Sequence, residues 1–208
     1  AGRMRHGDNQ GNVGLLRPGW VQWMTGGRGI IHSEMPEQEE GLMQGFQLWV
    51  NLPAKDKLTK PRYQDIDPEN VPVVERPDGT KVKVLVGSFD GISGPVTNVA
   101  TDPLYLDITL PAGVSARVPV QAEHNAFAYV FEATAKIGAE AQLVERGQLA
   151  VLSLGDGVTV EGGLQGGRLI LVAGRPLREP VAKYGPFVMN TPDEIRQAIA
   201  DYQAGRFV

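Results

Sequence analysis

The chain has 208 residues, of which 42% are hydrophobic and 21% charged, and its formal net charge is −4. This composition excludes wholesale disorder, and the acidic balance argues against nucleic acid as a direct partner because no basic stripe is available for a phosphate backbone. The absence of cysteine excludes both a disulfide framework and a thiolate metal site. A transition-metal site would therefore have to use imidazole and carboxylate ligands.

Apolar runs in the sequence are all shorter than the roughly 20 residues that a membrane-spanning helix needs. The first six residues, Ala1 to His6, lack the apolar centre of a secretory signal. We therefore expect a cytoplasmic monomer without a membrane partner. The 26 glycines and 15 prolines are spread along the chain, which is typical of many short strands joined by tight turns.

Alternating or continuous apolar runs recur at six places along the chain. They span residues 46–51, 82–86, 104–110, 126–131, 149–154 and 169–173. Such runs predict strands with one face packed inward. Turn signals between them, such as Pro77-Asp78-Gly79, support an all-β fold.

One helix is well marked near the end of the chain. Thr191 is placed to cap it, Pro192 fits its first position, and Glu194 completes a capping box. Apolar residues then recur at helical spacing from Ile195 onward, and Gly205 supplies a stop. We predict an amphipathic helix over about 191–204 that docks on a barrel wall.

The polar stretch from Ala54 to Asn70 interrupts the alternating pattern. We predict a linker over 67–73, an N-terminal domain over 1–66, and a C-terminal domain over 74–208 that carries the helix. The N-terminal part is short for a closed barrel and begins abruptly at Ala1. We therefore expect this first domain to be incomplete.

The densest chemical signal is a predicted strand that contains His32 and Glu34 and follows a glycine-rich bend. Residues two apart on a strand point to the same side, so this imidazole and this carboxylate can face one interior point. Together they form half of an octahedral or facial-triad site suited to Fe(II), Mn(II) or Ni(II). The alternative is that His32 is a hydrogen-bonded core histidine and Glu34 a surface acid, because short His-x-Glu pairs are weak motifs.

The other two histidines are interpreted as structural. His6 has no metal partner at strand spacing. His124 is flanked by Glu123 and Asn125, but neighbouring residues on a strand face opposite sides and do not form a cluster.

The run from Val21 to Met35 resembles the signature of the pirin family nearly residue for residue. Further blocks similar to that family span 46–52, 104–107, 173–180 and 185–191, so the likeness covers essentially the whole chain. The resemblance implies a bicupin, in which two stacked cupin (jelly-roll) β-barrels form one chain and a metal, usually iron, lies in the N-terminal barrel only. In this chain the first barrel would be incomplete.

Pirins hold their metal with three histidines and one glutamate, and the last histidine and the glutamate match His32 and Glu34. The other two ligands come from an upstream His-x-His motif, and this sequence starts after that point. The resemblance therefore implies an Fe(II) site that is short of two histidines here, with weak or absent metal binding.

Two functions follow from the resemblance. Some bacterial pirins resemble quercetin 2,3-dioxygenase in activity, with an aromatic flavonol as substrate; Glu34 would then also be the catalytic base that accepts the substrate's hydroxyl proton. Other pirins are associated with transcription factors or metabolic enzymes, as redox-sensitive binding modules without catalysis. A third hypothesis is a structural remnant that has lost the metal. The residues do not decide between an enzyme and a regulator, because both use the same metal ligands.

Overall fold

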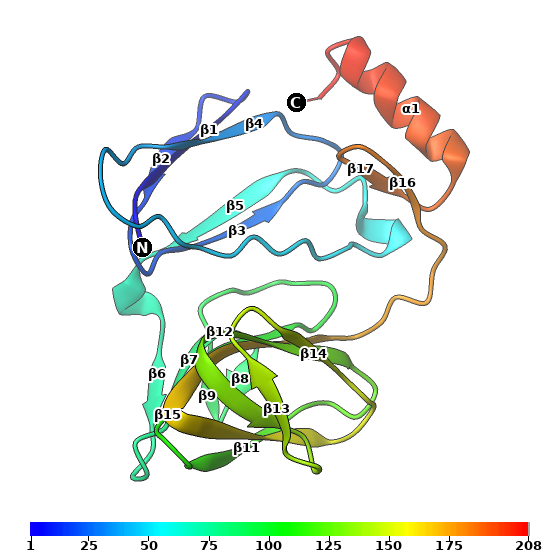
Figure 1. Ribbon diagram of the computed structural model, residues 1–208. Coiled ribbons are helices and arrows are strands. Elements are labelled where there is room, and N and C mark those ends of the chain that lie inside the picture. Colours follow the sequence, from blue (N-terminus) through cyan, green and yellow to red (C-terminus); the bar gives the residue numbers. More distant parts are fainter. Residues whose placement is uncertain (208) are drawn as a thin grey trace. The chain divides into compact units, whose positions relative to one another are not determined.

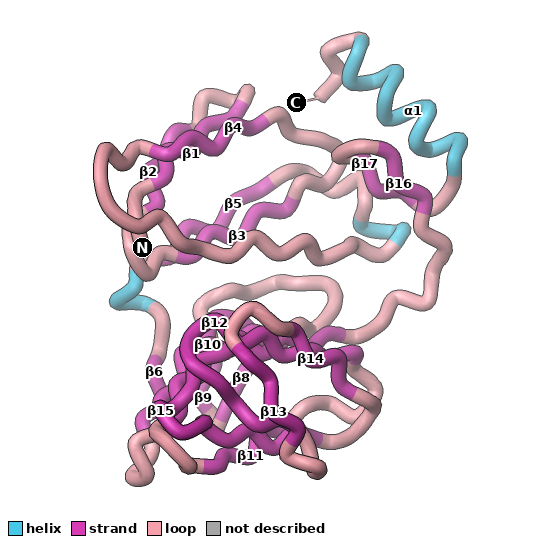
Figure 2. Tube along the Cα trace, viewed as in Figure 1, coloured by secondary structure: helices cyan, strands magenta, loops and turns pink. Residues whose placement is uncertain are grey.

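The structure is a computed structural model that describes residues 1–207 (Figure 1). Strands joined by short loops make up most of it, and the one α-helix in this range, α1 (Pro192–Gln203), lies near the C-terminus (Figure 2). The predicted mostly β architecture with a C-terminal helix is confirmed. No helix in residues 1–207 combines the length and the apolar character that crossing a membrane requires.

The chain forms two compact units. The first consists of residues 1–68 and 177–208, and the second consists of residues 69–176. The strands of the first unit are β1 (Met4–Asp8), β2 (Val13–Leu16), β3 (Val21–Thr25), β4 (His32–Pro36), β5 (Arg62–Ile66), β16 (Ala182–Tyr184) and β17 (Phe187–Met189). The strands of the second unit are β6 (Val73–Glu75), β7 (Lys81–Val86), β8 (Ser88–Phe89), β9 (Ile92–Ser93), β10 (Leu104–Leu110), β11 (Ser115–Pro119), β12 (Asn125–Ile137), β13 (Gln142–Glu145), β14 (Leu149–Leu152) and β15 (Gly157–Gly174).

In this division, α1 belongs to the same compact unit as the N-terminal strands. The sequence-based division into 1–66, 67–73 and 74–208 follows chain order instead, and it stays a prediction. The structure places a short 3-10 turn at Pro68–Asn70, where the chain passes from the first unit to the second.

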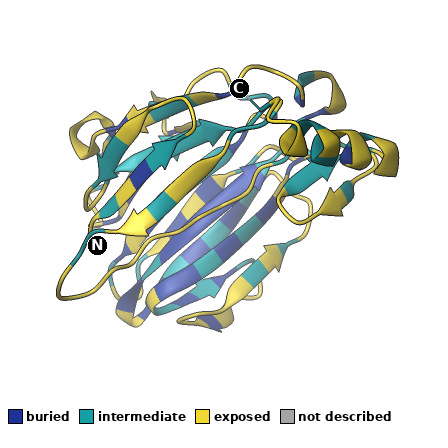
Figure 3. Cartoon of the chain, turned by 90° about the horizontal axis from the view of Figure 1, so that it is seen from above, coloured by how far each residue is buried: buried dark blue, intermediate teal, exposed yellow. Residues whose placement is uncertain are grey.

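The second unit is built on one antiparallel sheet of eight strands. Its main path runs β13-β12-β15-β10-β7-β6, while β11 pairs with β15 and β14 pairs with β12. Along these strands, buried positions alternate with half-buried and exposed ones (Figure 3), as expected for strands with one face in a core. The fully buried side chains that fill this core include Val82, Val84, Leu106, Ile108, Val130, Leu169 and Leu171. The strands predicted over 82–86, 104–110 and 169–173 are confirmed.

Glycines permit the close crossing of β12 and β15. The register between these strands shifts near Glu132 and again near Ala133, where the backbone φ is 51°. Opposite this bend, a Cβ on Gly167 would lie 2.3 Å from the Thr134 carbonyl oxygen, and one on Gly163 would lie 1.9 Å from Thr134 Oγ1. The glycine-rich stretch of β15 is therefore required by the tight curvature of the sheet.

The first unit contains smaller sheets with the orders β2-β1-β4, β3-β5 and β16-β17. One predicted strand is wrong here, because the alternating run from Phe46 to Asn51 joins no sheet among the described residues. Backbone hydrogen bonds connect Gln44 with Ala1 just before it, and Phe46, Leu48 and Val50 are exposed. A period-two pattern produces a strand only where a neighbouring backbone provides the hydrogen-bonding ladder.

The predicted helix start is confirmed. Thr191 Oγ1 accepts a hydrogen bond from the Glu194 backbone nitrogen at 3.3 Å, and Glu194 Oε2 accepts one from the Thr191 backbone nitrogen at 2.7 Å. The hydrogen bond with the Thr191 side chain holds the pKa of the Glu194 carboxyl below its usual value. The helix buries Ile195 and packs on the β16–β17 hairpin.

We predict that Thr191→Ala lowers the free energy of unfolding by about 1 kcal/mol, because it removes the side-chain acceptor of the cap. Thr191→Ser keeps an acceptor oxygen in place and serves as the control. The measurement is urea unfolding followed by circular dichroism, and an unfolding midpoint shared by all three proteins would contradict the prediction.

Candidate functional site

The pairing of β1 with β4 gathers polar side chains on one face of the sheet β2-β1-β4. In this antiparallel ladder Glu34 lies opposite His6, and His32 lies opposite Asp8. Directly opposed residues share a face, as do residues two apart on one strand. His32 and Glu34 therefore point to the same side of the sheet, together with His6 and Asp8. Their role as metal ligands stays a prediction.

The two predicted ligands differ in their surroundings. His32 is exposed, whereas Glu34 is half-buried. Glu34 Oε2 accepts a hydrogen bond from Gln47 Nε2 at 3.0 Å. Gln47 belongs to the extended segment that follows β4 in the chain. Such a hydrogen bond orients a carboxylate in the way that outer partners orient metal ligands.

The residue types at this face suit a divalent metal, but their number does not. Across residues 1–207, no group of three or more His, Cys, Asp or Glu side chains is arranged to hold a metal ion. A facial triad needs three protein ligands, and His32 with Glu34 provides two. The described residues therefore do not form a complete metal centre, and we assign no catalytic step through a metal.

His6 is buried in a cluster of polar side chains that joins two sheets. Its ring lies over Gly14, where an added Cβ would come within 2.2 Å of His6 Nε2. Gln22 Nε2 lies 3.1 Å from His6 Nε2 and 3.2 Å from His6 Nδ1, and it donates a hydrogen bond to Asp65 Oδ1 at 2.9 Å. Asp65 Oδ2 lies 3.9 Å from His6 Nε2. His6 on β1 is thus tied to Gln22 on β3 and Asp65 on β5.

Tyr63 on β5 connects the same two sheets at a second point. Its phenol is hydrogen-bonded to the Asp8 carboxylate, and burial raises the pKa of Tyr63 to about 12, with Asp8, Asp65 and Glu34 adding to the rise. Tyr63 is therefore neutral at physiological pH and donates to Asp8. Asp8 Oδ1 also accepts from the backbone nitrogens of Gln10 and Asn12, which shapes the turn after β1.

Gln22, Asp65 and Tyr63 were missed by sequence reasoning. The two strands that carry them pair with Gln22 opposite Asp65, so positions 43 apart in the chain come together. A polar residue such as Gln22 within a predicted strand is a weak signal of a polar interior. The sequence does not show which strand pairs with it.

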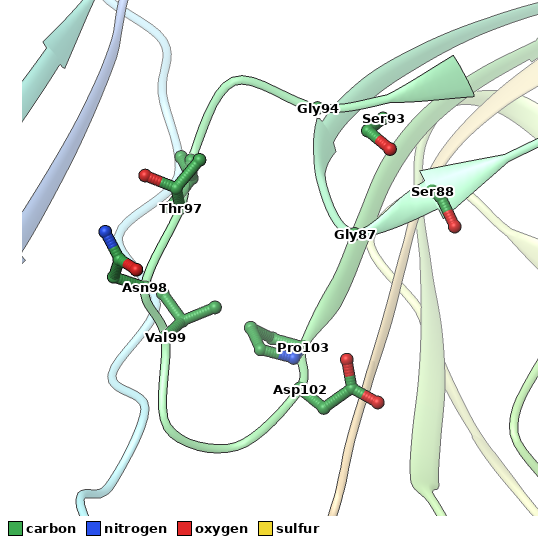
Figure 4. A pocket seen from close by; sticks show the side chains of 10 residues that line it. Gly87, Ser88, Ser93, Gly94, Thr97, Asn98, Val99, Asp102 and Pro103 are labelled. Atoms are coloured by element: carbon green, nitrogen blue, oxygen red, sulfur yellow. The ribbon is translucent and has the colours of Figure 1, made fainter. Parts of the chain in front are cut away.

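A pocket of about 420 Å³ lies in the second unit, beside β8 and β9 (Figure 4). Polar side chains of Ser88, Ser93, Asn98 and Asp102 contribute to its lining. Asp102 Oδ2 also lies 3.7 Å from Nε2 of the buried His124. The pocket contains neither His32 nor Glu34, so it is separate from the predicted metal face.

The fold resembles solved structures of one class. A quercetin 2,3-dioxygenase from Acinetobacter baumannii matches with a TM-score of 0.89 and 29% sequence identity, covering 100% of this chain and 73% of that one. The architecture, with strands closing around an apolar core and a polar face on a smaller sheet, is that of a cupin-fold protein.

Sequence comparisons define the family. Residues 1–50 match the pirin model, and residues 105–208 match the model of the pirin C-terminal cupin domain. A pirin-like protein from Caulobacter vibrioides is 46% identical over 207 residues, which is 99% of this chain and 74% of the relative. Human pirin is 42% identical over 205 residues, which is 97% of this chain and 70% of the relative. The chain belongs to the pirin family, and the predicted resemblance is confirmed.

We predict unequal effects on stability for the two histidines on this face. His6→Ala should lower the free energy of unfolding by about 1–3 kcal/mol, because it leaves a cavity over Gly14 and polar groups of Gln22 without their partner. His32→Ala, at an exposed position, should change it by less than about 0.5 kcal/mol. Urea unfolding of the two variants checks this, and equal destabilisation would show that the cluster around His6 does not hold the sheets together.

Proposed function

We propose that this chain is a pirin-type dioxygenase that acts on flavonols such as quercetin. It would contribute two metal ligands and the residue that accepts the substrate's proton. In this proposal His32 and Glu34 are two protein ligands of an Fe(II) ion. The observation that carries the proposal is the β1–β4 register, which puts this imidazole and this carboxylate on one face. The similarity to a quercetin 2,3-dioxygenase supports the substrate class.

Glu34 is the residue proposed to move a proton. Because Gln47 engages Glu34 Oε2, the carboxylate has a defined orientation and its Oε1 is the proposed acceptor of the flavonol's hydroxyl proton. The proposed Fe(II) ion would be held by His32 and Glu34. His32 would orient that ion without taking part in proton transfer.

The proposal predicts that the protein, loaded anaerobically with Fe(II), consumes oxygen when quercetin is added. His32→Ala and Glu34→Ala should each lower this rate at least about 100-fold, because each removes one of only two protein ligands. The matched control is Ser33→Ala, which changes the residue between them on the opposite face of β4. An oxygen electrode and elemental analysis of bound iron are the measurements.

Loss of activity in Ser33→Ala as well would show that β4 is generally sensitive to substitution. No oxygen uptake by the unaltered protein, together with no retained iron, would contradict the proposal. One observation favours the non-enzymatic alternative: Leu42 and Trp49 are 67% and 61% exposed, and exposed apolar side chains in one segment are typical of a protein contact. A stable protein complex without turnover would support that alternative.

A further inference from the structure

The end of the chain folds back onto the loop that leads into β4. The Phe207 ring lies directly against Gly29, because a Cβ added at Gly29 would come within 2.7 Å of the ring atoms Cγ and Cδ2. The ring also packs with those of Phe187 and Tyr202, at centroid separations of 6.0 and 5.7 Å. Phe207 thereby connects α1 and β17 with a loop that lies nearly 180 positions earlier in the sequence.

A single side chain joins this C-terminal contact to the strand with the predicted ligands. Asn9 Nδ2 donates a hydrogen bond to the Phe207 carbonyl oxygen at 3.1 Å. Its Oδ1 accepts one from the Ile31 backbone nitrogen at 3.2 Å, and its own backbone nitrogen donates to the Ile31 carbonyl oxygen at 2.9 Å. Asn9 directly follows β1 and Ile31 directly precedes His32, so these bonds continue the β1–β4 ladder by one step.

The same loop is held from its other side. The Arg28 backbone nitrogen donates to the Thr59 carbonyl oxygen at 2.9 Å. A Cβ on Gly27 would lie 2.1 Å from that oxygen, and φ at Gly27 is +52°, so this close approach requires glycine. The loop of residues 26–31 is therefore held between Thr59 and the C-terminal segment.

The C-terminal segment leaves the helix in a defined direction. Gly205 has φ of +67° and its nitrogen bonds the Tyr202 carbonyl oxygen at 3.0 Å, which is a glycine stop. Arg206 then returns to Asp201, with its Nε 2.8 Å and its Nη2 2.5 Å from Asp201 Oδ1. The ring of Phe207 is directed toward Gly29 by these contacts.

We propose that Phe207 and Asn9 are positioning residues that hold the loop of residues 26–31, so that β4 presents His32 and Glu34 in a fixed orientation. Such support is needed because, within residues 1–207, β4 pairs with β1 alone and His32 is exposed. Strand ends with few packed neighbours open locally at low cost in free energy. The functional consequence of this inference rests on the proposed ligand role of His32 and Glu34, whereas the structural part does not.

The test uses two variants that remove different parts of the contact. Asn9→Asp is isosteric and keeps an acceptor for the Ile31 nitrogen, but it loses the donor to the Phe207 carbonyl. Phe207→Ala removes the ring from Gly29, and Phe207→Leu restores apolar bulk as the conservative variant. The matched control is Tyr202→Ala, which removes another ring of the same cluster and leaves the Phe207–Asn9 hydrogen bond in place.

Hydrogen–deuterium exchange, read by mass spectrometry on the whole chain, measures the opening of residues 26–34. We expect exchange there to accelerate about tenfold in Phe207→Ala and about fivefold in Asn9→Asp. Phe207→Leu should be close to the unaltered protein, and peptides from β10 should be unchanged. Unchanged exchange at residues 26–34, or equal acceleration across the first unit in Phe207→Ala and Tyr202→Ala, would overturn the proposal.

Titration with Ni(II), followed by calorimetry, tests the functional consequence. Weaker Ni(II) binding in Phe207→Ala and Asn9→Asp, by about fivefold, is expected if loop opening misplaces the ligands. Faster exchange with unaltered Ni(II) affinity would overturn the positioning role. If the unaltered protein binds no Ni(II) while exchange responds as expected, the contact holds the loop and the proposed ligand role is the part that fails.

Discussion

The antiparallel register between β1 and β4 is the constraint on which the candidate site depends. It runs without a shift from Met4 opposite Pro36 to Asp8 opposite His32. A slip of one residue would move every side chain of β4 to the other face of the sheet and separate His32 and Glu34 from His6 and Asp8. The cluster of buried His6 with Gln22 and Asp65 resists such a slip, because it ties β1 to the pair of strands β3 and β5.

The two units are stabilised by different interactions. The second unit has a core of interdigitating valine, leucine and isoleucine side chains. In the first unit, the buried apolar side chains among the described residues are those of Pro53, Pro61, Ile66 and Ile195. Its buried groups include His6 and Lys57, and Lys57 Nζ donates to Asn51 Oδ1 at 2.7 Å, while burial lowers the pKa of Lys57. Hydrogen bonds therefore carry much of the specificity of the first unit, which makes its geometry sensitive to single polar substitutions.

Membership of the pirin family and the geometry of the first unit both support the proposed function. In the proposed function, His32 and Glu34 are two ligands and Glu34 is also the base, and Gln47 orients the Glu34 carboxylate. The neutral phenol of Tyr63 donates to Asp8 on the same face, and Asp8 Oδ1 accepts from the Asn12 backbone nitrogen. Local rigidity at the site thus comes from neighbouring polar contacts, as ligand-bearing strands commonly require.

The sequence by itself determined several strands of the apolar unit, including those over 82–86, 104–110 and 169–173, the start of α1, and that His32 and Glu34 share a side. These features depend on spacings of two or three residues along the chain, and a local pattern encodes them directly. Only the tertiary structure decided that the run at 46–51 lacks a ladder, that α1 belongs to one compact unit with the N-terminal strands, and that Asn9 meets Phe207. Those outcomes involve partners that lie 43 to 198 positions apart in the sequence. Pairing at such distances depends on the tertiary fold and cannot be read from a local pattern.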